Sequence, residues 1–133
     1  MNGERAFLDT NVLLYLYAKD DAKADKVDAL LRERPVISVQ VLNEFINVSR
    51  RKFARDWSTI IPAIESLGAL CEVVPLEVTS QRKAVEIAVR DGFSIYDANI
   101  VTAAAMAGCT ILFSEDMQHS RRIEGLTIVN PFA

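Results

Sequence analysis

Short apolar runs alternate with longer amphipathic stretches along the 133 residues of this chain. Runs rich in Val, Ile, Leu and Phe predict buried strands over residues 5–9, 36–38, 71–76, 111–113 and 126–129. Apolar residues at helical spacing predict helices over residues 12–17, 20–34, from 39 or 40 to 53, 56–70 and 78–90. Short strands that alternate with helices are typical of an α/β sandwich around a mostly parallel sheet. Because the chain has no repeats or linkers, we expect one domain over residues 1–133.

A further predicted helix begins at Asp97 and is the most apolar of all. Gly108 ends it, and only Asn99 and Thr102 interrupt its apolar residues. A helix that is apolar on nearly all sides is packed on nearly all sides, which puts Asp97 in the middle of the fold. A carboxylate in that position must cap the helix, be paired with another group, or hold a cation.

Composition indicates a soluble protein with a sizeable core, since half of the residues are hydrophobic. Cys71 and Cys109 are too few for a disulfide framework, and their apolar surroundings predict reduced, buried side chains in a cytoplasmic protein. Asp9 and Asn11 interrupt the first apolar run where a signal peptide needs its hydrophobic region. Residues 98–113 are the most apolar span, but they are split by Gly108 and fall short of the ~20 residues that cross a bilayer. We therefore expect no membrane partner.

Four acids occupy related positions in this predicted architecture. Asp9 ends the first strand, Glu44 lies in the first turns after the second, and Asp116 follows the strand at 111–113. Asp97 opens the helix that leads into that same strand. Because parallel sheets place ligands at the carboxyl ends of their strands, we expect these acids along one edge of the sheet.

Each acid also has a purely structural explanation. Asp9 and Asp97 could cap helices, Asp116 could be a turn residue, and Glu44 could extend to solvent. Thr10 and Asn11 are good capping residues for the helix at 12–17 as well.

Four carboxylates in one place need a common explanation, because like charges repel and burying an unpaired carboxylate is costly. A shared divalent cation resolves both problems. Ligands that are all carboxylate oxygens favour Mg²⁺ or Mn²⁺ over zinc, and Mg²⁺ held this way keeps open positions for phosphate substrates. The chemistry predicted from this set is metal-assisted hydrolysis of a phosphodiester. The net charge of −3 does not exclude nucleic acid, since 15 basic groups face 14 acidic ones once these four are set aside.

With these features the sequence resembles the PIN-domain family, and within it the VapC-type ribonuclease toxins of prokaryotic toxin–antitoxin pairs. Each matching segment alone is weakly specific, but together they span nearly the whole chain in the order and spacing of the family. The segments are residues 7–12 (FLDTNV), 41–45 (VLNEF), 94–101 (SIYDANIV), 112–119 (LFSEDMQH) and 128–132 (IVNPF).

The resemblance implies a three-layer α/β/α sandwich with a five-stranded, mostly parallel sheet and a metal-dependent endoribonuclease. It carries over an acidic quartet that binds Mg²⁺ or Mn²⁺, namely Asp9, Glu44, Asp97 and Asp116. Thr10 and Ser114 match small polar positions that support the site, and Asn11 adjoins them. The resemblance further implies an RNA substrate, a homodimer and inhibition by a cognate antitoxin protein.

Basic residues outside the acidic quartet give weaker signals. Arg50, Arg51 and Lys52, with Arg55 nearby, follow the helix that carries Glu44, and either contact the RNA backbone or form a solvated helix end. A second candidate pair for phosphate contact is Arg121 and Arg122. His119 is expected to be an exposed turn residue, and Glu115 to lie beside the site rather than to be a fifth ligand. Tyr15, Tyr17 and Trp57 are expected in packing or a dimer face rather than in base stacking.

Two rival functions need separate tests. A phosphohydrolase with a covalent aspartyl intermediate, or a receiver domain, needs a second acid near Asp9 and a lysine near the active edge, and neither is present. The other rival is a PIN-fold binding module that acts mainly in a repressor complex with its antitoxin and has weak or no catalysis.

Overall fold

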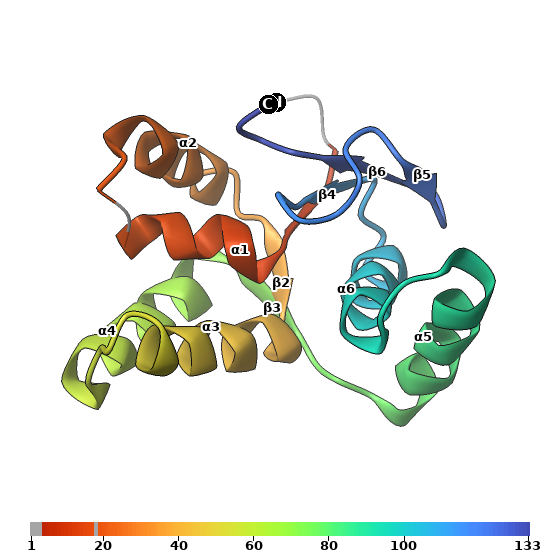
Figure 1. Ribbon diagram of the computed structural model, residues 1–133, viewed down its shortest axis with the longest axis horizontal. Coiled ribbons are helices and arrows are strands. Elements are labelled where there is room, and N and C mark those ends of the chain that lie inside the picture. The colour runs from red at the N-terminus through yellow and green to blue at the C-terminus, as the bar shows by residue number, and fades with distance from the viewer. Residues whose placement is uncertain (1–3, 18) are drawn as a thin grey trace.

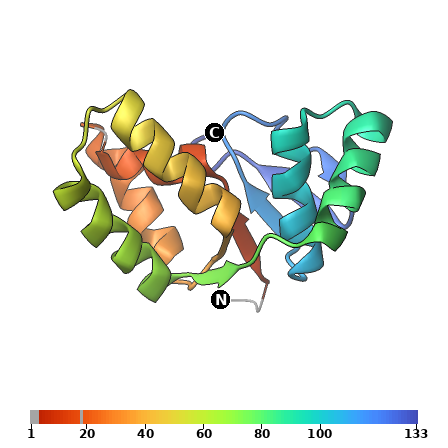
Figure 2. The same cartoon turned by 90° about the horizontal axis from the view of Figure 1, so that it is seen from below.

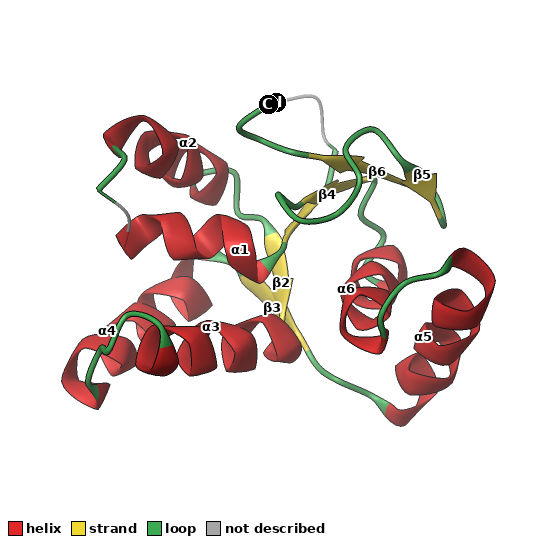
Figure 3. Cartoon of the chain, viewed as in Figure 1, coloured by secondary structure: helices red, strands yellow, loops and turns green. Residues whose placement is uncertain are grey.

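The computed structural model describes residues 4–17 and 19–133, and the strands of this part of the chain form one sheet (Figures 1 and 3). The strand order is β3-β2-β1-β4-β6-β5. The strands are β1 (Ala6–Leu8), β2 (Val36–Ser38), β3 (Glu72–Val74), β4 (Ile111–Phe113), β5 (Arg122–Ile123) and β6 (Leu126–Val129). All neighbouring strands are parallel except β5 and β6, which are antiparallel. The predicted α/β fold with a mostly parallel sheet is confirmed.

The sheet differs from the five-stranded expectation by the short strand β5. Arg122 pairs with Thr127 and Ile123 with Leu126, across a tight turn at Glu124 and Gly125. Both turn residues have positive φ, 52° and 78°, as a two-residue hairpin turn of type I′ requires. A two-residue strand has no hydrophobic periodicity, so Gly125 is the only sequence signal for this hairpin among the described residues.

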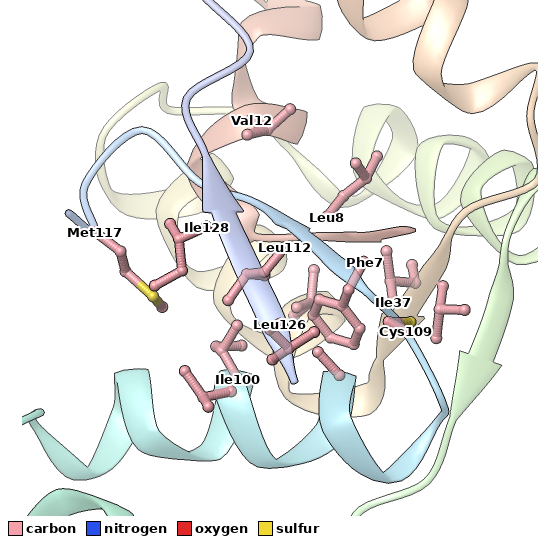
Figure 4. Close-up of a cluster of buried hydrophobic side chains, with 14 of the residues drawn as sticks. Phe7, Leu8, Val12, Ile37, Ile100, Cys109, Leu112, Met117, Leu126 and Ile128 are labelled. Atoms are coloured by element: carbon pink, nitrogen blue, oxygen red, sulfur yellow. The ribbon is translucent and has the colours of Figure 1, made fainter. Parts of the chain in front are cut away.

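Helices gather in two groups with the strands between them (Figures 1 and 2). One group holds α1 (Thr10–Leu13), the 3₁₀ helix η1 (Leu14–Tyr17), α2 (Asp21–Leu31), α3 (Val39–Arg51) and α4 (Trp57–Leu70). The other consists of α5 (Val78–Asp91) and α6 (Ile95–Met106), which pack against each other. Figure 4 shows Ile100 of α6 and Val12 of α1 on opposite sides of the strands, so both faces of the sheet are covered.

The core lies on both faces of the two central strands. Phe7 and Leu8 of β1 are neighbours in sequence, yet both are fully buried. Since successive residues of a strand point to opposite faces, a strand buried on both sides reads as a continuous apolar run. Leu112 of β4 and Ile128 of β6 extend this core across the sheet (Figure 4).

Several predicted helix ends are wrong for identifiable reasons. The helix expected over residues 20–34 ends at Leu31, three residues before Arg34. Arg34 has a φ of 49°, outside the right-handed helical region, and the proline that follows it also disfavours a helical residue at this position. The cap of α1 is Asp9, whose carboxylate accepts from the N–H of Thr10, rather than Thr10 or Asn11. The structural explanation of Asp9 as a capping residue is therefore correct.

The apolar helix α6 begins at Ile95, two residues before Asp97, because Ser94 caps it by accepting from the N–H of Asp97. Its middle turns are buried, as expected. Its ends are not, since Tyr96 and Met106 are 64% and 56% exposed, so the expectation of packing along the whole helix is wrong.

Both cysteines are free and buried, as predicted. Burial raises the pKa of the Cys71 and Cys109 thiols to about 11, which keeps them protonated and unreactive at neutral pH. Among the helices of the described residues, none has the length and apolar character to cross a bilayer.

Candidate active site

The four acids line a single open cavity of about 220 Å³. Asp9 directly follows β1, and its N–H donates to the carbonyl of Phe113 at the end of the adjacent parallel strand β4 (2.9 Å). Asp116 lies in the loop that continues from β4. The cavity is completed by Glu44 from α3, the helix that follows β2, and by Asp97 from the first turn of α6. The carboxyl ends of the strands are where parallel sheets bind ligands.

No lysine or arginine of the described residues lines this cavity. The other lining residues are polar amides, a hydroxyl and two apolar side chains: Thr10, Asn11, Leu14, Asn47 and Val48. The carboxylates border the cavity without converging on a point, because the described chain holds no group of three Asp, Glu, His or Cys side chains close enough to bind one ion as they stand. The negative charge of the cavity is therefore not neutralised by basic side chains.

Asp9 is the most constrained of the four acids. It is only 5% exposed, and its Oδ1 accepts from the Thr10 N–H at 2.7 Å. Its Oδ2 accepts from Ser114 Oγ at 2.9 Å and from Asn11 Nδ2 at 3.3 Å. Burial nevertheless raises the pKa of Asp9 from 3.8 to about 6, and the nearby charge of Glu44 adds to that shift. The hydrogen bonds lower the pKa but do not offset the loss of solvent.

Glu44 is held by two side chains of different origin. Its Oε2 accepts from Thr10 Oγ1 at 2.8 Å, and its Oε1 accepts from Gln40 Nε2 at 3.0 Å, one helical turn earlier. Thr10 therefore contacts two acids at once, Asp9 through its backbone N–H and Glu44 through its hydroxyl. Glu44 does not extend freely into solvent.

Asp97 and Asp116 complete the cavity from two other directions. Asp97 is half-buried, and burial together with the charges of Glu44 and Asp116 raises its pKa above the ordinary value. Asp116 is exposed. Asp97 is not a capping residue, since Ser94 has that role.

Asn11 connects the two strand ends that carry acids. Its Nδ2 donates to Asp9 Oδ2 and, at 3.4 Å, to Ser114 Oγ. Its Oδ1 accepts from the Glu115 N–H at 3.0 Å. The three small polar residues singled out in the sequence, Thr10, Asn11 and Ser114, thus all contact Asp9, and Thr10 also contacts Glu44.

The donor set is suited to a hard divalent cation. Every charged group that lines the cavity is a carboxylate, and the remaining polar lining groups offer amide or hydroxyl oxygens. Mg²⁺ and Mn²⁺ prefer such oxygen ligands, and a bound cation would offset the burial and the repulsion that together raise the pKa values of Asp9 and Asp97. The oxygen donors that line this cavity are therefore chemically suited to Mg²⁺ or Mn²⁺.

The basic residues after Glu44 differ in their surroundings. Arg51 and Lys52 line a second hollow of about 350 Å³ together with Asn47 and Val48, which also line the acidic cavity. Arg50 instead lies over the ring of Trp57, with its guanidinium carbon 4.7 Å from the ring centre. One continuous surface along α3 thus leads from the acidic cavity to Arg51 and Lys52.

The second basic pair lies elsewhere. Arg121 donates to the carbonyl of Asp91 (2.9 Å) and lies over the ring of Phe93. Arg122 borders a hollow with Thr110 and Gly125, near the amino ends of β4 and β6. It therefore lies at the edge of the sheet opposite the acidic cavity.

His119 has a structural contact, since its Nδ1 accepts from the Asn130 N–H at 2.9 Å. Sequence reasoning missed Gln40 and Asn47 near Glu44. Their spacings of four and three residues along one helix from Glu44 were the available signal.

Comparisons with known proteins agree with this architecture. The PIN domain model matches residues 6–124. Similar solved structures include a toxin–antitoxin complex from Klebsiella pneumoniae (TM-score 0.71, 19% identity, covering 95% of this chain and 97% of that chain). VapBC-1 from nontypeable Haemophilus influenzae has a TM-score of 0.68 at 21% identity, covering 96% of this chain and 98% of that chain.

VapC20 from Mycobacterium tuberculosis, a sarcin-ricin loop cleaving toxin, has a TM-score of 0.67 at 22% identity and covers 84% of this chain and 91% of that chain. No curated protein matches the chain by sequence. At these identities the structural likeness concerns the fold, whereas the family model spans most of the chain, from β1 to the turn between β5 and β6. With acids at the carboxyl ends of a parallel sheet and this match across its length, the chain belongs to the PIN domain family.

Proposed function

We propose that this protein is a divalent-metal-dependent endoribonuclease and the toxin of a type II toxin–antitoxin pair. One observation carries the proposal: four carboxylates line a single cavity at the carboxyl ends of the strands, with no basic side chain among the described residues that line it. The PIN domain match supports it, as do the similar structures that are toxins or toxin–antitoxin complexes.

In this proposal Asp9, Asp97 and Asp116 hold the principal Mg²⁺ or Mn²⁺, and Glu44 completes a second position or orients the attacking water. The bound ion supplies polarisation of the phosphodiester and activation of water. Asp9 is prepared for this role because the hydrogen bonds from Ser114 and Thr10 fix both of its oxygens. Thr10 also orients Glu44, so one residue couples the positions of two ligands.

RNA is the proposed substrate, and the surface along α3 is its proposed path. Glu44 and Arg51 are seven residues apart on α3, which corresponds to roughly 10 Å along the helix axis. Cations at that separation from the acidic cavity suit a phosphate group near the one to be cleaved. Arg51 and Lys52 take this role in the proposal because both line the hollow next to the acidic cavity, whereas Arg50 does not. Arg122 is not included because it lies at the opposite edge of the sheet.

The proposed protein partners are a cognate antitoxin and a second copy of the chain. The support for the antitoxin is the nature of the similar structures, which include VapBC complexes from Rickettsia felis and Salmonella typhimurium. The second copy rests on the family resemblance alone. We propose a cytoplasmic location, in keeping with the two buried, reduced cysteines.

The decisive experiment measures cleavage of defined RNAs during titration with Mg²⁺ or Mn²⁺. Asp97→Asn is expected to abolish cleavage while leaving the melting temperature unchanged or raised, because it removes one of the repelling charges. Asp25→Asn, an exposed acid on α2, is the matched control and is expected to cleave like the wild type. Metal-dependent cleavage retained by Asp97→Asn would contradict the assigned role.

A second candidate function is a PIN-fold binding module that acts mainly in a repressor complex with its antitoxin. It is favoured by the fact that the described carboxylates border the cavity without converging on one point. The same titration separates the two functions, because the module predicts antitoxin binding with no metal-dependent cleavage by the wild type.

A further inference from the structure

A cluster beside the acidic cavity ties the loop that carries Asp116 to the helices on the far side of Asp9. We call it the Glu115 clamp, and it consists of Glu115, Tyr15, Lys23 and Asn11. Tyr15 OH lies 2.7 Å and 2.9 Å from the two carboxylate oxygens of Glu115. Lys23 Nζ lies 3.5 Å from Glu115 Oε2 and donates to Tyr15 OH at 3.2 Å.

The clamp holds Glu115 at its backbone and at its side chain. The Glu115 N–H donates to Asn11 Oδ1 at 3.0 Å, while its carboxylate is held by Tyr15 and Lys23. The same Asn11 side chain donates to Asp9 Oδ2. The clamp is therefore joined by hydrogen bonds to the most constrained acid of the cavity.

Packing fixes the other end of the clamp. The ring of Tyr15 meets Phe132 edge-on with ring centres 4.7 Å apart, and Lys23 Nζ lies over both rings at 4.6 Å and 5.1 Å. Lys26 of the same helix donates to the carbonyl of Pro131 at 3.2 Å. Tyr15 and Lys23 are thus anchored on η1, on α2 and on the last residues of the chain.

Asp116 depends on this loop for its position. Asp116 lines the acidic cavity, whereas Glu115 does not. In residues 4–17 and 19–133 no hydrogen bond or ion pair holds the Asp116 carboxylate itself. Its neighbours are held, since Ser114 Oγ accepts from the Met117 N–H at 3.3 Å and Glu115 is in the clamp. The backbone on either side of Asp116 therefore fixes the position from which its side chain extends into the cavity.

We propose that Glu115, Tyr15 and Lys23 are positioning residues that hold Asp116 at the edge of the acidic cavity for cation binding. This inference rests on the proposed function, in which Asp116 is a metal ligand. Glu115 acts through the backbone of its neighbour and does not touch the ion. Surface ion pairs contribute little to global stability, so removal of the clamp is expected to affect the site more than the fold.

The test uses the full chain without RNA and follows Mn²⁺ binding by the electron paramagnetic resonance signal of free Mn²⁺. Tyr15→Phe removes only the hydroxyl, and Glu115→Ala removes the carboxylate. Both are expected to weaken Mn²⁺ binding by roughly 10-fold, the lower end for lost partners of metal ligands. Glu115→Gln keeps an oxygen that accepts from Tyr15 OH and is expected to restore most of the affinity.

Tyr17→Phe is the matched control, because the Tyr17 hydroxyl contacts Ser49 rather than the loop of Asp116. It is expected to bind Mn²⁺ like the wild type. Hydrogen exchange at the Glu115 and Met117 amides is a readout independent of the metal, and it is expected to accelerate in Tyr15→Phe but not in Tyr17→Phe. Melting temperatures are expected to agree within about 3 °C.

The two proposals fail in different ways. Wild-type protein that binds Mn²⁺ no better than Asp97→Asn would overturn the proposed function and the positioning role together. Wild-type binding that is lost in Asp97→Asn but unchanged in Tyr15→Phe and Glu115→Ala would overturn the positioning role alone. Weaker binding in both clamp variants, with faster exchange at Glu115, supports it.

Discussion

Asp9 serves two purposes with one carboxylate, and they conflict in the absence of a cation. It caps α1 and accepts from Ser114, which favours a charged group. Its burial favours the neutral form more strongly, so the net result is a raised pKa. In the metal-free protein, Asp9 therefore contributes least to the stability of the fold at neutral pH, where its carboxylate is charged.

This conflict predicts a pH dependence of the metal-free protein. Because the pKa of Asp9 is raised from 3.8 to about 6 by folding, the native state binds its proton more tightly than the unfolded state does. The contribution of Asp9 to the free energy of unfolding is therefore full below about pH 4 and is lost as the pH rises toward 6. A shift of this size corresponds to about 3 kcal/mol.

The measurement is denaturant unfolding in the presence of EDTA between pH 4 and 8, for the wild type and Asp9→Asn. Asp9→Asn cannot titrate, so its stability relative to the wild type is expected to increase over that interval and then to level off above pH 6. A difference between the two proteins that stays constant across the interval would contradict the prediction.

Among the secondary-structure elements, replacing a glycine inside a helix and one just after a helix should change stability in opposite directions. Gly108 has a φ of +76° just after α6, and no heavy atom lies within 4 Å of the position its Cβ would take. Gly108→Ala is therefore expected to cost roughly 1–2 kcal/mol through backbone conformation alone. Gly68, inside α4, is equally open but has helical backbone, so Gly68→Ala is expected to stabilise by roughly 0.5–1 kcal/mol.

Thermal or denaturant unfolding of the two variants checks this pair. Since neither site is crowded, the sign of each change reports the backbone conformation and not packing. Equal effects of the two substitutions would show that φ at position 108 is not the controlling factor.

Elements with a strong pattern were predictable from sequence, and elements determined by single contacts were not. The strands β2, β4 and β6 have the predicted bounds because their apolar runs are limited by turn residues and a helix cap. The start of α6 was misplaced because Ser94 and Asp97 are both good caps, and only the structure shows that the Ser94 hydroxyl accepts from the Asp97 N–H. The short strand β5 depends on its pairing with β6 and leaves no pattern of its own.

At the scale of the whole molecule, topology explains why the site could be anticipated. Asp9 and Asp116 were expected together because β1 and β4 end at the same edge of a parallel sheet, and the structure has β1 and β4 as neighbours. The Glu115 clamp could not be anticipated, since it joins residues 92 and 100 positions apart whose side chains have many other possible partners. The detailed orientation of the carboxylates is equally beyond sequence, because it depends on hydrogen bonds such as that from Thr10 to Glu44.

The surface along α3 predicts how RNA affinity depends on salt. For a non-cleavable RNA analogue measured at saturating Mn²⁺, Arg51→Gln with Lys52→Gln is expected to make the salt dependence shallower than in the wild type. The slope of log affinity against log salt should fall by about 0.7 for each phosphate of the single strand that a basic side chain no longer neutralises. Arg122→Gln, at the opposite edge of the sheet, is the control and is expected to leave the slope unchanged.

Fluorescence anisotropy of a labelled RNA at several salt concentrations measures these slopes. If the slope of log affinity against log salt is the same for the double variant and its parent, RNA does not bind along α3. A shallower slope for Arg122→Gln would instead show that RNA reaches the amino ends of β4 and β6.

The acidic cavity without basic neighbours has a consequence for the order of events in the proposed nuclease. Four uncompensated carboxylates repel an RNA backbone, so the ion-free enzyme is a poor receptor for its own substrate. A dication bound in the cavity halves that negative charge and so reduces the repulsion, and thermodynamic reciprocity requires bound RNA to strengthen binding of the ion by the same factor. The concentration of free Mg²⁺ is therefore expected to control the affinity for RNA as well as the rate of hydrolysis.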